Sequence, residues 1–327
     1  MIISRTPFRL SIVGGGSDFQ EYHRNRPGAV VSMAIDRHMY VTVNKRFDDT
    51  IRVSYTKTQI VDHLDDLEHG LIRESLRRTG VTRGVEVTTI ADLPAGIGLG
   101  SSSSLTVGVL NALCAYRGLY VTPEKLARMA CEIEIDTLHS PIGKQDQYIA
   151  AYGAFQHIRF NGNGRVLVEP IVCRPQTVRK LVGNLLLFYT GVNRDAGSVL
   201  TEVKNNIRTA PEVATALDRL VDLVEELLGM LSRGKLEAVG DLLDRSWTLK
   251  REMGSRVSNG TLDALYRLAI AAGAKGGKVA GAGGGGCLLL YVERSAQASV
   301  RGCMSRSGMK EIRFNIDAAG SKNIFAG

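Results

Sequence analysis

The sequence lacks paired cysteines, long apolar runs and a secretion signal. Its cysteines show no Cys-x-x-Cys spacing and lie far apart, at positions 114, 131, 173, 287 and 303. Such cysteines argue against a disulfide framework or a zinc site and favour reduced, mostly buried thiols. No apolar run reaches the roughly 20 residues of a membrane helix, and the first residues lack the basic and then apolar order of a signal peptide. These absences predict a cytoplasmic protein with no membrane partner.

The common nucleotide-binding and kinase signatures are also missing. None of the Gly-Lys pairs, which begin at positions 143, 234 and 277, is followed by the Ser or Thr of a Walker-type loop. The His-Arg-Asp and Asp-Phe-Gly triplets of protein kinases do not occur. The glycine spacing at 96–100 does not fit the dinucleotide-binding fingerprint. Any nucleotide site in this chain therefore belongs to another lineage.

Aromatic residues are scarce, at 6% of the sequence, and the basic residues are scattered although the formal net charge is +8. Nucleic-acid-binding proteins favour clustered Lys and Arg with interleaved aromatics. The charge therefore favours attraction of small anionic ligands, with an ordinary solvated surface as the plainer alternative and nucleic acid as the weakest one.

At 327 residues, 44% of them hydrophobic and 23% charged, the chain is long enough for two domains with sizeable cores. The first part predicts strands at 2–13, 29–43, 51–55, 85–90, 154–159 and 166–169, and helices at 67–78, 102–117 and 122–138. The second part predicts strands at 185–189 and 287–292 and helices at 196–207, 212–232, 236–253 and 261–272. This change from mostly strands to mostly helices predicts an α+β protein with domains 1–184 and 185–327.

The most informative segment, residues 92–104, has spaced glycines and then four serines between a predicted strand and a predicted helix. Glycines let the backbone approach a ligand closely, and the N–H groups and positive dipole end of the helix attract anions. A capped connection is the simpler alternative, but one N-cap uses only one serine. The segment therefore predicts a nucleotide phosphate loop made of Pro94, Gly96, Gly98, Leu99, Gly100, Ser101, Ser102, Ser103 and Ser104.

Three other segments accompany this loop. Residues 6–18 contain Arg9 and end in Gly14-Gly15-Gly16-Ser17-Asp18, residues 141–148 contain Asp146, and residues 276–286 are rich in glycine. In this order the four segments resemble the GHMP kinases (galactokinase, homoserine kinase, mevalonate kinase and phosphomevalonate kinase) over about residues 5–292. The resemblance implies an N-terminal domain like the ribosomal S5 fold, a helix-rich C-terminal α/β domain, and ATP and Mg²⁺ as cofactors.

Within the family, the chain resembles one subgroup more than the others. Galactokinases and mevalonate kinases carry Gly-Glu-His where this chain has Gly14-Gly15-Gly16, whereas residues 5–18, 141–148, 189–194 and 246–251 resemble the D-glycero-D-manno-heptose 7-phosphate kinases. The resemblance implies ATP-dependent phosphorylation of the anomeric hydroxyl of that sugar phosphate to the 1,7-bisphosphate. The product would supply nucleotide-activated heptose for a capsule or lipopolysaccharide.

The same resemblance assigns catalytic roles. Asp146 corresponds to the catalytic aspartate, which accepts or orients the sugar proton, and Arg9 to the cation that keeps it ionised. Ser102 and Glu134 correspond to the magnesium ligands. Each residue has a structural alternative: a helix cap for Asp146, a strand-edge salt bridge for Arg9, and a neighbouring acid, Glu132 or Asp136, in place of Glu134.

Substrate contacts are expected from residues in all the motifs. Asp18 resembles the sugar-hydroxyl ligand, with an Asx turn as its alternative, and the loop 281–286 is expected to close the cleft rather than form a free hairpin. For the distal phosphate the candidates are Lys144, Arg194, Lys204 and Arg208, of which Arg194 suits a phosphate best. The predicted substrate-binding residues are Gly15, Gly16, Ser17, Asp18, Lys144, Gln145, Arg194, Gly283 and Gly284.

Two other functions remain open. A kinase for another sugar, such as fucose or an unphosphorylated heptose, would keep the same motifs. A nucleotide-binding regulator without turnover would keep the fold, although such proteins usually lose one of Arg9, Ser102, Glu134 and Asp146. The oligomeric state is left open, and the expected ligands are ATP and a small sugar phosphate.

Overall fold

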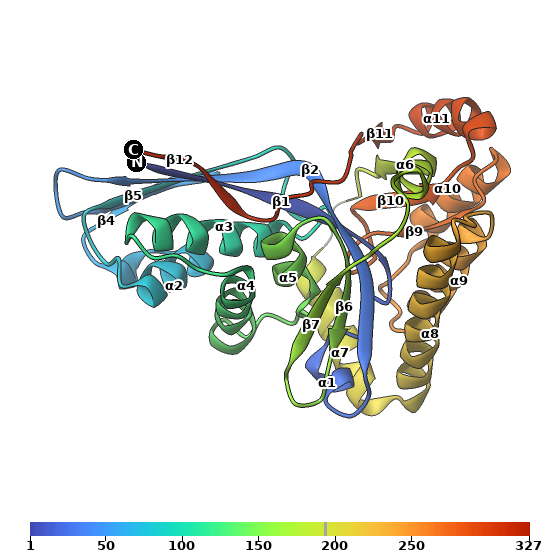
Figure 1. The fold of residues 1–327 in the computed structure, drawn as a ribbon, viewed down its shortest axis with the longest axis horizontal. Coiled ribbons are helices and arrows are strands. Elements are labelled where there is room, and N and C mark those ends of the chain that lie inside the picture. The colour runs from blue at the N-terminus through green and yellow to red at the C-terminus, as the bar shows by residue number, and fades with distance from the viewer. Residues whose placement is uncertain (193–194) are drawn as a thin grey trace.

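A long, bent sheet forms the N-terminal part of the molecule, for which the computed structural model describes residues 1–192 and 195–327. Its strand order is β12-β1-β2-β5-β3-β4, with β6 paired to β2 and β7 paired to β6. The exceptionally long β2 pairs with β5 through its second half and with β6 through its first, so the sheet turns between two arms (Figure 1). Its strands are β1 (Ile2–Val13), β2 (Gly28–Lys45), β3 (Ile51–Ser54), β4 (Thr58–Val61), β5 (Val85–Ala91), β6 (Phe155–Phe160), β7 (Val166–Pro170) and β12 (Lys322–Ala326).

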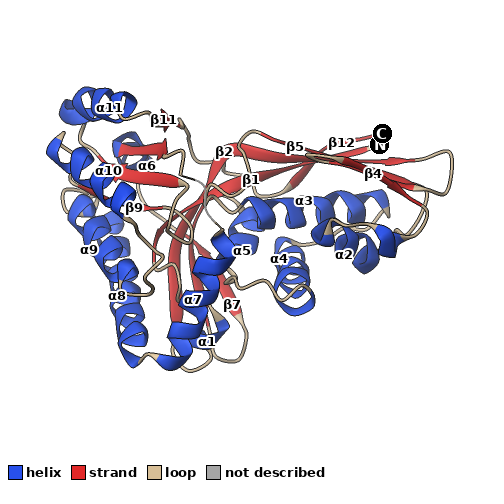
Figure 2. Ribbon diagram, turned by 180° about the vertical axis from the view of Figure 1, so that it is seen from behind, coloured by secondary structure: helices blue, strands red, loops and turns tan. Residues whose placement is uncertain are grey.

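Helices cover one face of this sheet (Figure 2). The central one, α3 (Ser101–Tyr116), packs on β1 and β2 and is buried over most of its length. The four-residue α1 (Gln20–His23) follows β1. The other helices of this part are α2 (Gly70–Thr79), α4 (Pro123–Cys131) and α5 (Gln145–Tyr152), with short turns at Leu64–Asp66 and Glu132–Thr137.

The C-terminal part is a smaller antiparallel sheet with helices around it. Its strand order is β11-β8-β10-β9, from β8 (Leu185–Tyr189), β9 (Gly276–Val279), β10 (Cys287–Tyr291) and β11 (Lys310–Glu311). In α8 the apolar residues recur with the helical period and are buried, which fixes the face that packs on the rest of the domain. The helices are α6 (Pro175–Asn184), α7 (Ala196–Thr209), α8 (Pro211–Arg233), α9 (Val239–Arg251), α10 (Gly260–Ala271) and α11 (Gln297–Arg306), with a turn at Arg294–Ala296.

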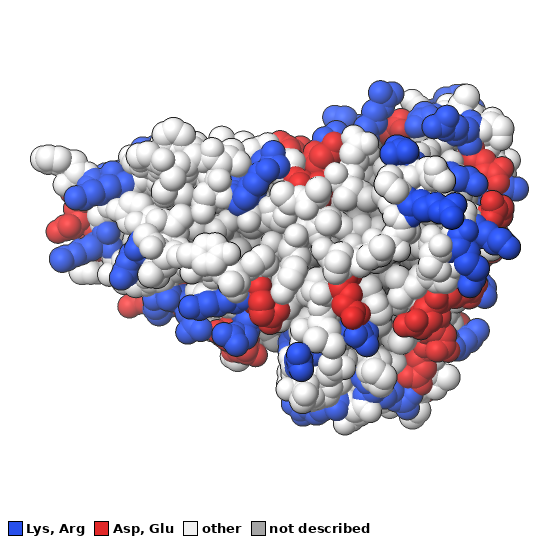
Figure 3. All heavy atoms as spheres, viewed as in Figure 1, with Lys and Arg blue, Asp and Glu red and all other residues white. Residues whose placement is uncertain are grey.

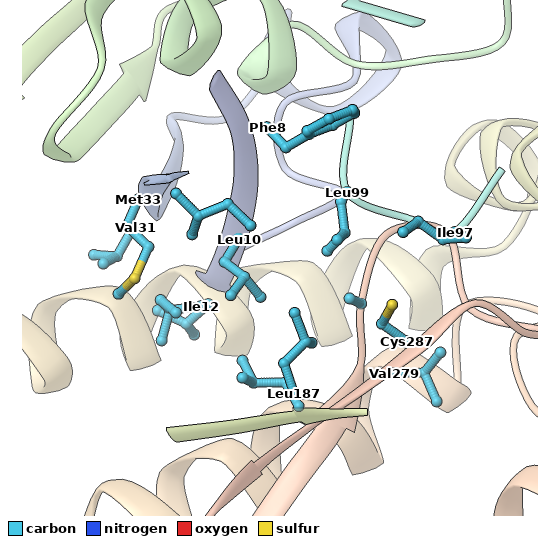
Figure 4. Packing of buried hydrophobic residues seen from close by; sticks show 14 of the residues in the cluster. Phe8, Leu10, Ile12, Val31, Met33, Ile97, Leu99, Leu187, Val279 and Cys287 are labelled. Atoms are coloured by element: carbon cyan, nitrogen blue, oxygen red, sulfur yellow. The ribbon is translucent and has the colours of Figure 1, made fainter. Parts of the chain in front are cut away.

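One hydrophobic core joins the two parts. It continues from β1 and β2 through Ile97 and Leu99 of the predicted phosphate loop to Leu187, Val279 and Cys287 of the second sheet. Figure 4 shows these side chains gathered between the two sheets. The phosphate loop is therefore held by side chains that belong to the core.

The last residues return to the first sheet. Strand β12 pairs with β1, and a bridge joins Ile316 to Ile35. The expected C-terminal domain of residues 185–327 must therefore be corrected, because about its last dozen residues pack with the N-terminal part. The second sheet itself starts at Leu185, immediately after the expected boundary.

Most expected elements occur, and the differences have local causes. The helix expected over 122–138 becomes a π-helical turn from Glu132 onward, and the glycine-rich stretch from 275 contains strand β9. In the described part of the chain, no helix is both long and apolar enough to cross a membrane. The described cysteines are all free, and the visible face in Figure 3 carries Lys and Arg interspersed with Asp and Glu.

Candidate active site

A bidentate ion pair joins the segment 6–18 to the segment 141–148. Arg9, on β1, donates from Nε to Asp146 Oδ1 at 2.6 Å and from a terminal nitrogen to Oδ2 at 2.7 Å. The remaining guanidinium nitrogen donates to the carbonyl of Gly98 at 2.6 Å. Arg9 is buried, whereas the Asp146 side chain keeps 21% exposure. One cation thus fixes both the carboxylate and the phosphate loop, and the carboxylate remains accessible.

A second carboxylate lies beside this pair. Asp18 Oδ1 accepts from the Gly16 N–H at 2.9 Å and from the Gln145 side chain at 3.1 Å, and Oδ2 accepts from the Gln145 N–H at 3.2 Å. Burial raises the pKa of Asp18, the Gly16 N–H opposes this, and the Asp146 carboxylate adds to the rise. Gly143 permits this approach, since a Cβ there would lie 2.0 Å from Asp18 Oδ2. Asp18 is therefore held rigidly against the start of α5.

The phosphate loop ends at Gly100, whose left-handed backbone (φ 76°) begins α3 without a side-chain cap. Ser102, on the first turn, is exposed. Ser103 and Ser104 are buried instead: Ser103 Oγ donates to Glu134 Oε2 at 3.0 Å, and Ser104 Oγ donates to the Pro7 carbonyl at 2.8 Å. The uncapped N–H groups and the exposed Ser102 can meet an anion, whereas the predicted phosphate contacts of the Ser103 and Ser104 hydroxyls do not fit this geometry.

Glu134 is the buried acid of its turn. Glu132 is bonded to Arg78 at the surface, and Asp136 is exposed. Glu134 Oε1 is buried and makes no hydrogen bond of standard geometry. Burial raises the pKa of Glu134 to about 7. The π-helical turn that carries it is a feature frequent at functional sites.

The orphaned Glu134 oxygen tests the fit of the predicted magnesium site. Mg²⁺ prefers hard oxygen ligands and keeps several waters, so one carboxylate and one hydroxyl can suffice. A bound cation would give the Oε1 atom its missing partner. Glu134 Oε2 accepts a hydrogen bond from Ser103. Ser102, the expected second ligand, is instead exposed to solvent. The Glu134 carboxylate therefore fits a divalent cation, and Ser102 stays a predicted second ligand.

The two glycine loops lie directly against each other. A Cβ at Gly98 would lie 2.6 Å from the Ala280 carbonyl, and one at Gly281 would lie 2.6 Å from Gly98 Cα. Both positions also have left-handed backbone, at φ 85° and 69°. The glycine-rich C-terminal loop therefore packs on the phosphate loop, as expected for a loop that closes the cleft.

Two lysines that the sequence did not single out support these loops. Lys250, on α9, donates to the Gly281 carbonyl and lines the same pocket as Arg9 and Asp146. Lys278, on β9, donates to the Ile12 carbonyl at 3.0 Å. Burial and, to a smaller extent, the nearby Arg9 together lower the pKa of Lys278 to about 7. Lys250 lies in the segment 246–251 and Lys278 in the segment 276–286, but only the fold shows which atoms they bind.

The pocket next to the ion pair has a polar and an apolar wall. The polar wall is formed by the first motif, the α5 start and Lys250; the apolar wall comes from Phe19, α7 and the segment after α9. The described residues that line it are Arg9, Ser11, Gly15, Gly16, Asp18, Phe19, Ile142, Gly143, Gln145, Asp146, Leu200, Val203, Lys250, Met253, Val257, Gly281 and Ala282.

Several predicted substrate contacts lie elsewhere. Ser17 is buried and bonds to the carbonyls of Gly14 and Ala29, and Lys144 lines a separate cavity beside α4. Gly283 and Gly284 pack on Val257, and the pocket wall is formed by Gly281 and Ala282 in their place. These positions correct the expectation, because neighbours in a motif point to different sides of the backbone.

The other distal-phosphate candidates are also displaced. Lys204 pairs with Glu21 at 3.4 Å, and Arg208 is exposed. Arg194, the favoured candidate, lies outside the described residues.

Comparisons with known proteins agree with this geometry. The GHMP kinases N terminal domain matches residues 67–154, and the GHMP kinases C terminal domain matches residues 223–310. A D-glycero-alpha-D-manno-heptose 7-phosphate kinase from Campylobacter jejuni is 30% identical over 304 residues, 89% of each chain. A crystal structure of a D-glycero-D-manno-heptose 1-phosphate kinase from Bacteroides thetaiotaomicron has a TM-score of 0.82 at 25% identity, with complete coverage of both chains. Lactococcus lactis galactokinase shares the fold, with a TM-score of 0.77 at 18% identity over 99% of this chain and 95% of its own.

These similarities identify the family. The chain belongs to the GHMP kinase family, whose named members here are ATP-dependent phosphotransferases acting on sugars or other alcohols.

Proposed function

We propose that this GHMP kinase transfers the γ-phosphoryl group of ATP to the anomeric hydroxyl of D-glycero-D-manno-heptose 7-phosphate, forming the 1,7-bisphosphate. The observation that carries the proposal is the Arg9–Asp146 pair, which lies in a pocket and against the phosphate loop at once. The choice of sugar is supported by the heptose 7-phosphate kinase relative and by the Gly14-Gly15-Gly16-Ser17-Asp18 segment.

Asp146 is the group that receives or orients the proton of the attacking hydroxyl. Its carboxylate is partly exposed in the pocket, and Arg9 fixes both of its oxygens. Asp18 and Gln145 hold sugar hydroxyls, which aligns the anomeric oxygen with the phosphoryl group. Phosphoryl transfer needs mainly such positioning and compensation of charge, so no covalent enzyme intermediate is required.

Glu134 and Ser102 would hold Mg²⁺. The ion would supply charge neutralisation on the phosphate oxygens of ATP. The helix start at Gly100 and Ser101 offers N–H groups to the same phosphates. These donors follow Ile97 and Leu99, whose side chains are buried in the core.

Lys250 is the best-placed described residue for the phosphate at the far end of the sugar. The described lining residues include two cations, Arg9, which binds Asp146 and Gly98, and Lys250, which binds the Gly281 carbonyl on the opposite loop. It is buried at the C-terminal side of the pocket, where a charged partner is worth more than at the surface. Lys250 therefore replaces Lys144, Lys204 and Arg208 as the described candidate.

The experiment that tests this function is an ADP-release assay with Mg²⁺-ATP. The acceptor panel is D-glycero-D-manno-heptose 7-phosphate, mannose 6-phosphate, mannose, galactose, fucose and mevalonate, with Asp146→Asn as the inactive control. Strong preference for the heptose phosphate supports the proposal. Turnover of a free sugar alone would keep the kinase and replace the acceptor. Nucleotide binding without turnover on any acceptor would favour a regulator.

A further inference from the structure

The segment that we name the C-terminal strap, residues 315–321, contacts three elements at the proposed site, β1, β2 and α5. It follows the second sheet and leads into β12. Strand β1 carries Arg9, α5 carries Asp146, and β2 lies beside the strand that leads into the phosphate loop. The strap contacts all three elements, although the proposed mechanism uses none of its residues.

Asp317 is the centre of these contacts. Its Oδ2 atom lies 2.5 Å from His38 Nε2 and accepts from Arg5 at 3.3 Å. Its backbone N–H donates to the Ala34 carbonyl at 3.0 Å, and its carbonyl accepts from Ala154 at 2.8 Å. This buried residue therefore links β1, β2 and the segment that follows α5.

His38 continues the connection to the phosphate loop. Its backbone N–H donates to Asp92 Oδ2 at 2.8 Å, the Asp92 N–H donates to the His38 carbonyl at 2.9 Å, and His38 Nδ1 lies 3.6 Å from Asp92 Oδ2. Asp92 is the first residue of the Gly-Ser segment. A buried imidazole thus lies between the carboxylate of the strap and the carboxylate at which the loop begins.

The other end of the strap is fixed to the helix that carries Asp146. The Ser321 N–H donates to the Ala150 carbonyl at 2.9 Å, and its Oγ contacts Thr6 at 2.7 Å and Asn111 at 2.9 Å. The backbone approaches α5 so closely that a Cβ at Gly320 would lie 2.0 Å from the Ala151 carbonyl. The strap therefore spans from the end of α5 to the start of the loop.

We propose that Asp317, acting through His38, positions the ATP phosphate loop relative to Arg9 and Asp146. This inference rests on the proposed function, because it takes residues 92–100 as the loop that binds ATP. Both residues act through Asp92, which makes them positioning residues.

The loop needs a fixed point at its beginning. Its tip, residues 94–96, is exposed, while Ile97 and Leu99 fix only its far end in the core. The donors of a phosphate loop must face the ligand closely, so a small displacement of Asp92 weakens several contacts together.

The inference is tested by measuring the Kd of Mg²⁺-ADP. The method is calorimetry on the full chain, well below its unfolding temperature. The variants are Asp317→Asn, His38→Gln and, as a matched control, Ser321→Ala, which removes strap contacts outside the His38 path. Asp317→Asn weakens the contact between Asp317 and His38, and only part of that loss is transmitted to the loop. The Kd of Asp317→Asn is therefore expected to rise about three- to tenfold. His38→Gln keeps an amide donor, so its Kd is expected to lie between those of Asp317→Asn and the wild type. The Kd of Ser321→Ala is expected to stay within about twofold of the wild-type value.

The outcomes separate the two proposals. Equal Kd values in the wild type, Asp317→Asn and His38→Gln would overturn the proposed role of the strap, whatever these variants do to the unfolding temperature. Equal weakening by Ser321→Ala and Asp317→Asn would also overturn it, because general loosening of the tail would then explain the effect. Failure of the wild type to bind Mg²⁺-ADP would overturn the proposed function and the strap with it. If Asp317→Asn does not fold, the milder His38→Gln decides.

Discussion

Glu134→Gln is expected to stabilise the metal-free protein at pH 8 while it removes magnesium-dependent activity. Burial raises the pKa of Glu134 to about 7 in the folded chain, whereas an unfolded glutamate titrates near 4.3. The folded state therefore holds this proton more tightly. Stability that is present below the unfolded pKa is lost as pH rises from about 4.3 to about 7.

The size of this loss follows from the shift. At 1.36 kcal/mol per pKa unit, a carboxyl shifted from an ordinary value to about 7 costs the folded state on the order of 3 kcal/mol above pH 7. Glutamine keeps the shape without the charge, so the difference between variant and wild type is expected to grow over this pH window. In a chain of this size that corresponds to roughly 5 °C in unfolding temperature.

Thermal unfolding with a chelator, from pH 4.5 to 8, measures this difference directly. The control is Glu132→Gln, since Glu132 is partly exposed and bonded to Arg78 at the surface; its difference from the wild type is expected to lack the rise between pH 4.3 and 7. Added Mg²⁺ is expected to stabilise the wild type at pH 8 but not Glu134→Gln. Parallel pH curves for the wild type and Glu134→Gln would refute the reasoning about burial, and equal stabilisation by Mg²⁺ would refute the metal site.

Three further predictions concern Asp146, Lys250 and Lys278. Asp146→Asn is expected to lower kcat by orders of magnitude with Mg²⁺-ATP binding retained, as turnover and calorimetry can show; near-normal turnover would remove Asp146 from its role. Lys250→Met is expected to raise the KM for heptose 7-phosphate about tenfold or more while that for the unphosphorylated sugar changes little, and an equal rise for both sugars would assign Lys250 to the loop alone. Lys278→Met is expected to stabilise the protein most below pH 7, with a gain that shrinks toward pH 10, because the lowered pKa of Lys278 (about 7) makes its charged form costly in the folded state; a gain independent of pH in thermal unfolding would contradict this.

Local patterns predicted the α+β class, the family and most of the regular elements. The period of α8 and the alternation of β5 follow from which side of each element faces the core. The π-helical turn at Glu132–Thr137 could not be separated from the preceding helix, since their apolar periods are similar over so few residues. The return of β12 was also hidden, because its residues are exposed and short strands without a buried face have no strong pattern.

The candidate site was predictable where its chemistry lies in contiguous motifs. The roles of Arg9, Asp146 and Glu134 stay predictions until they are measured, although the structure brings the first two into contact. Lys250 and Lys278 lie in the segments 246–251 and 276–286, but the sequence did not show their contacts with Gly281 and Ile12, which only the assembled fold brings about. The His38–Asp317 contact joins residues 279 positions apart, so only the assembled fold reveals it.

The arrangement of the two glycine loops explains why the site requires both parts of the chain. Arg9 binds the carbonyl of Gly98, Lys250 binds that of Gly281, and the two glycines touch. Behind them, Ile97 packs in the same core as Cys287. The two cations are therefore held by backbone carbonyls of loops that touch each other. A larger residue at Gly98 or Gly281 is expected to separate the loops and move both Arg9 and Lys250, because a Cβ at either position would lie 2.6 Å from the facing loop.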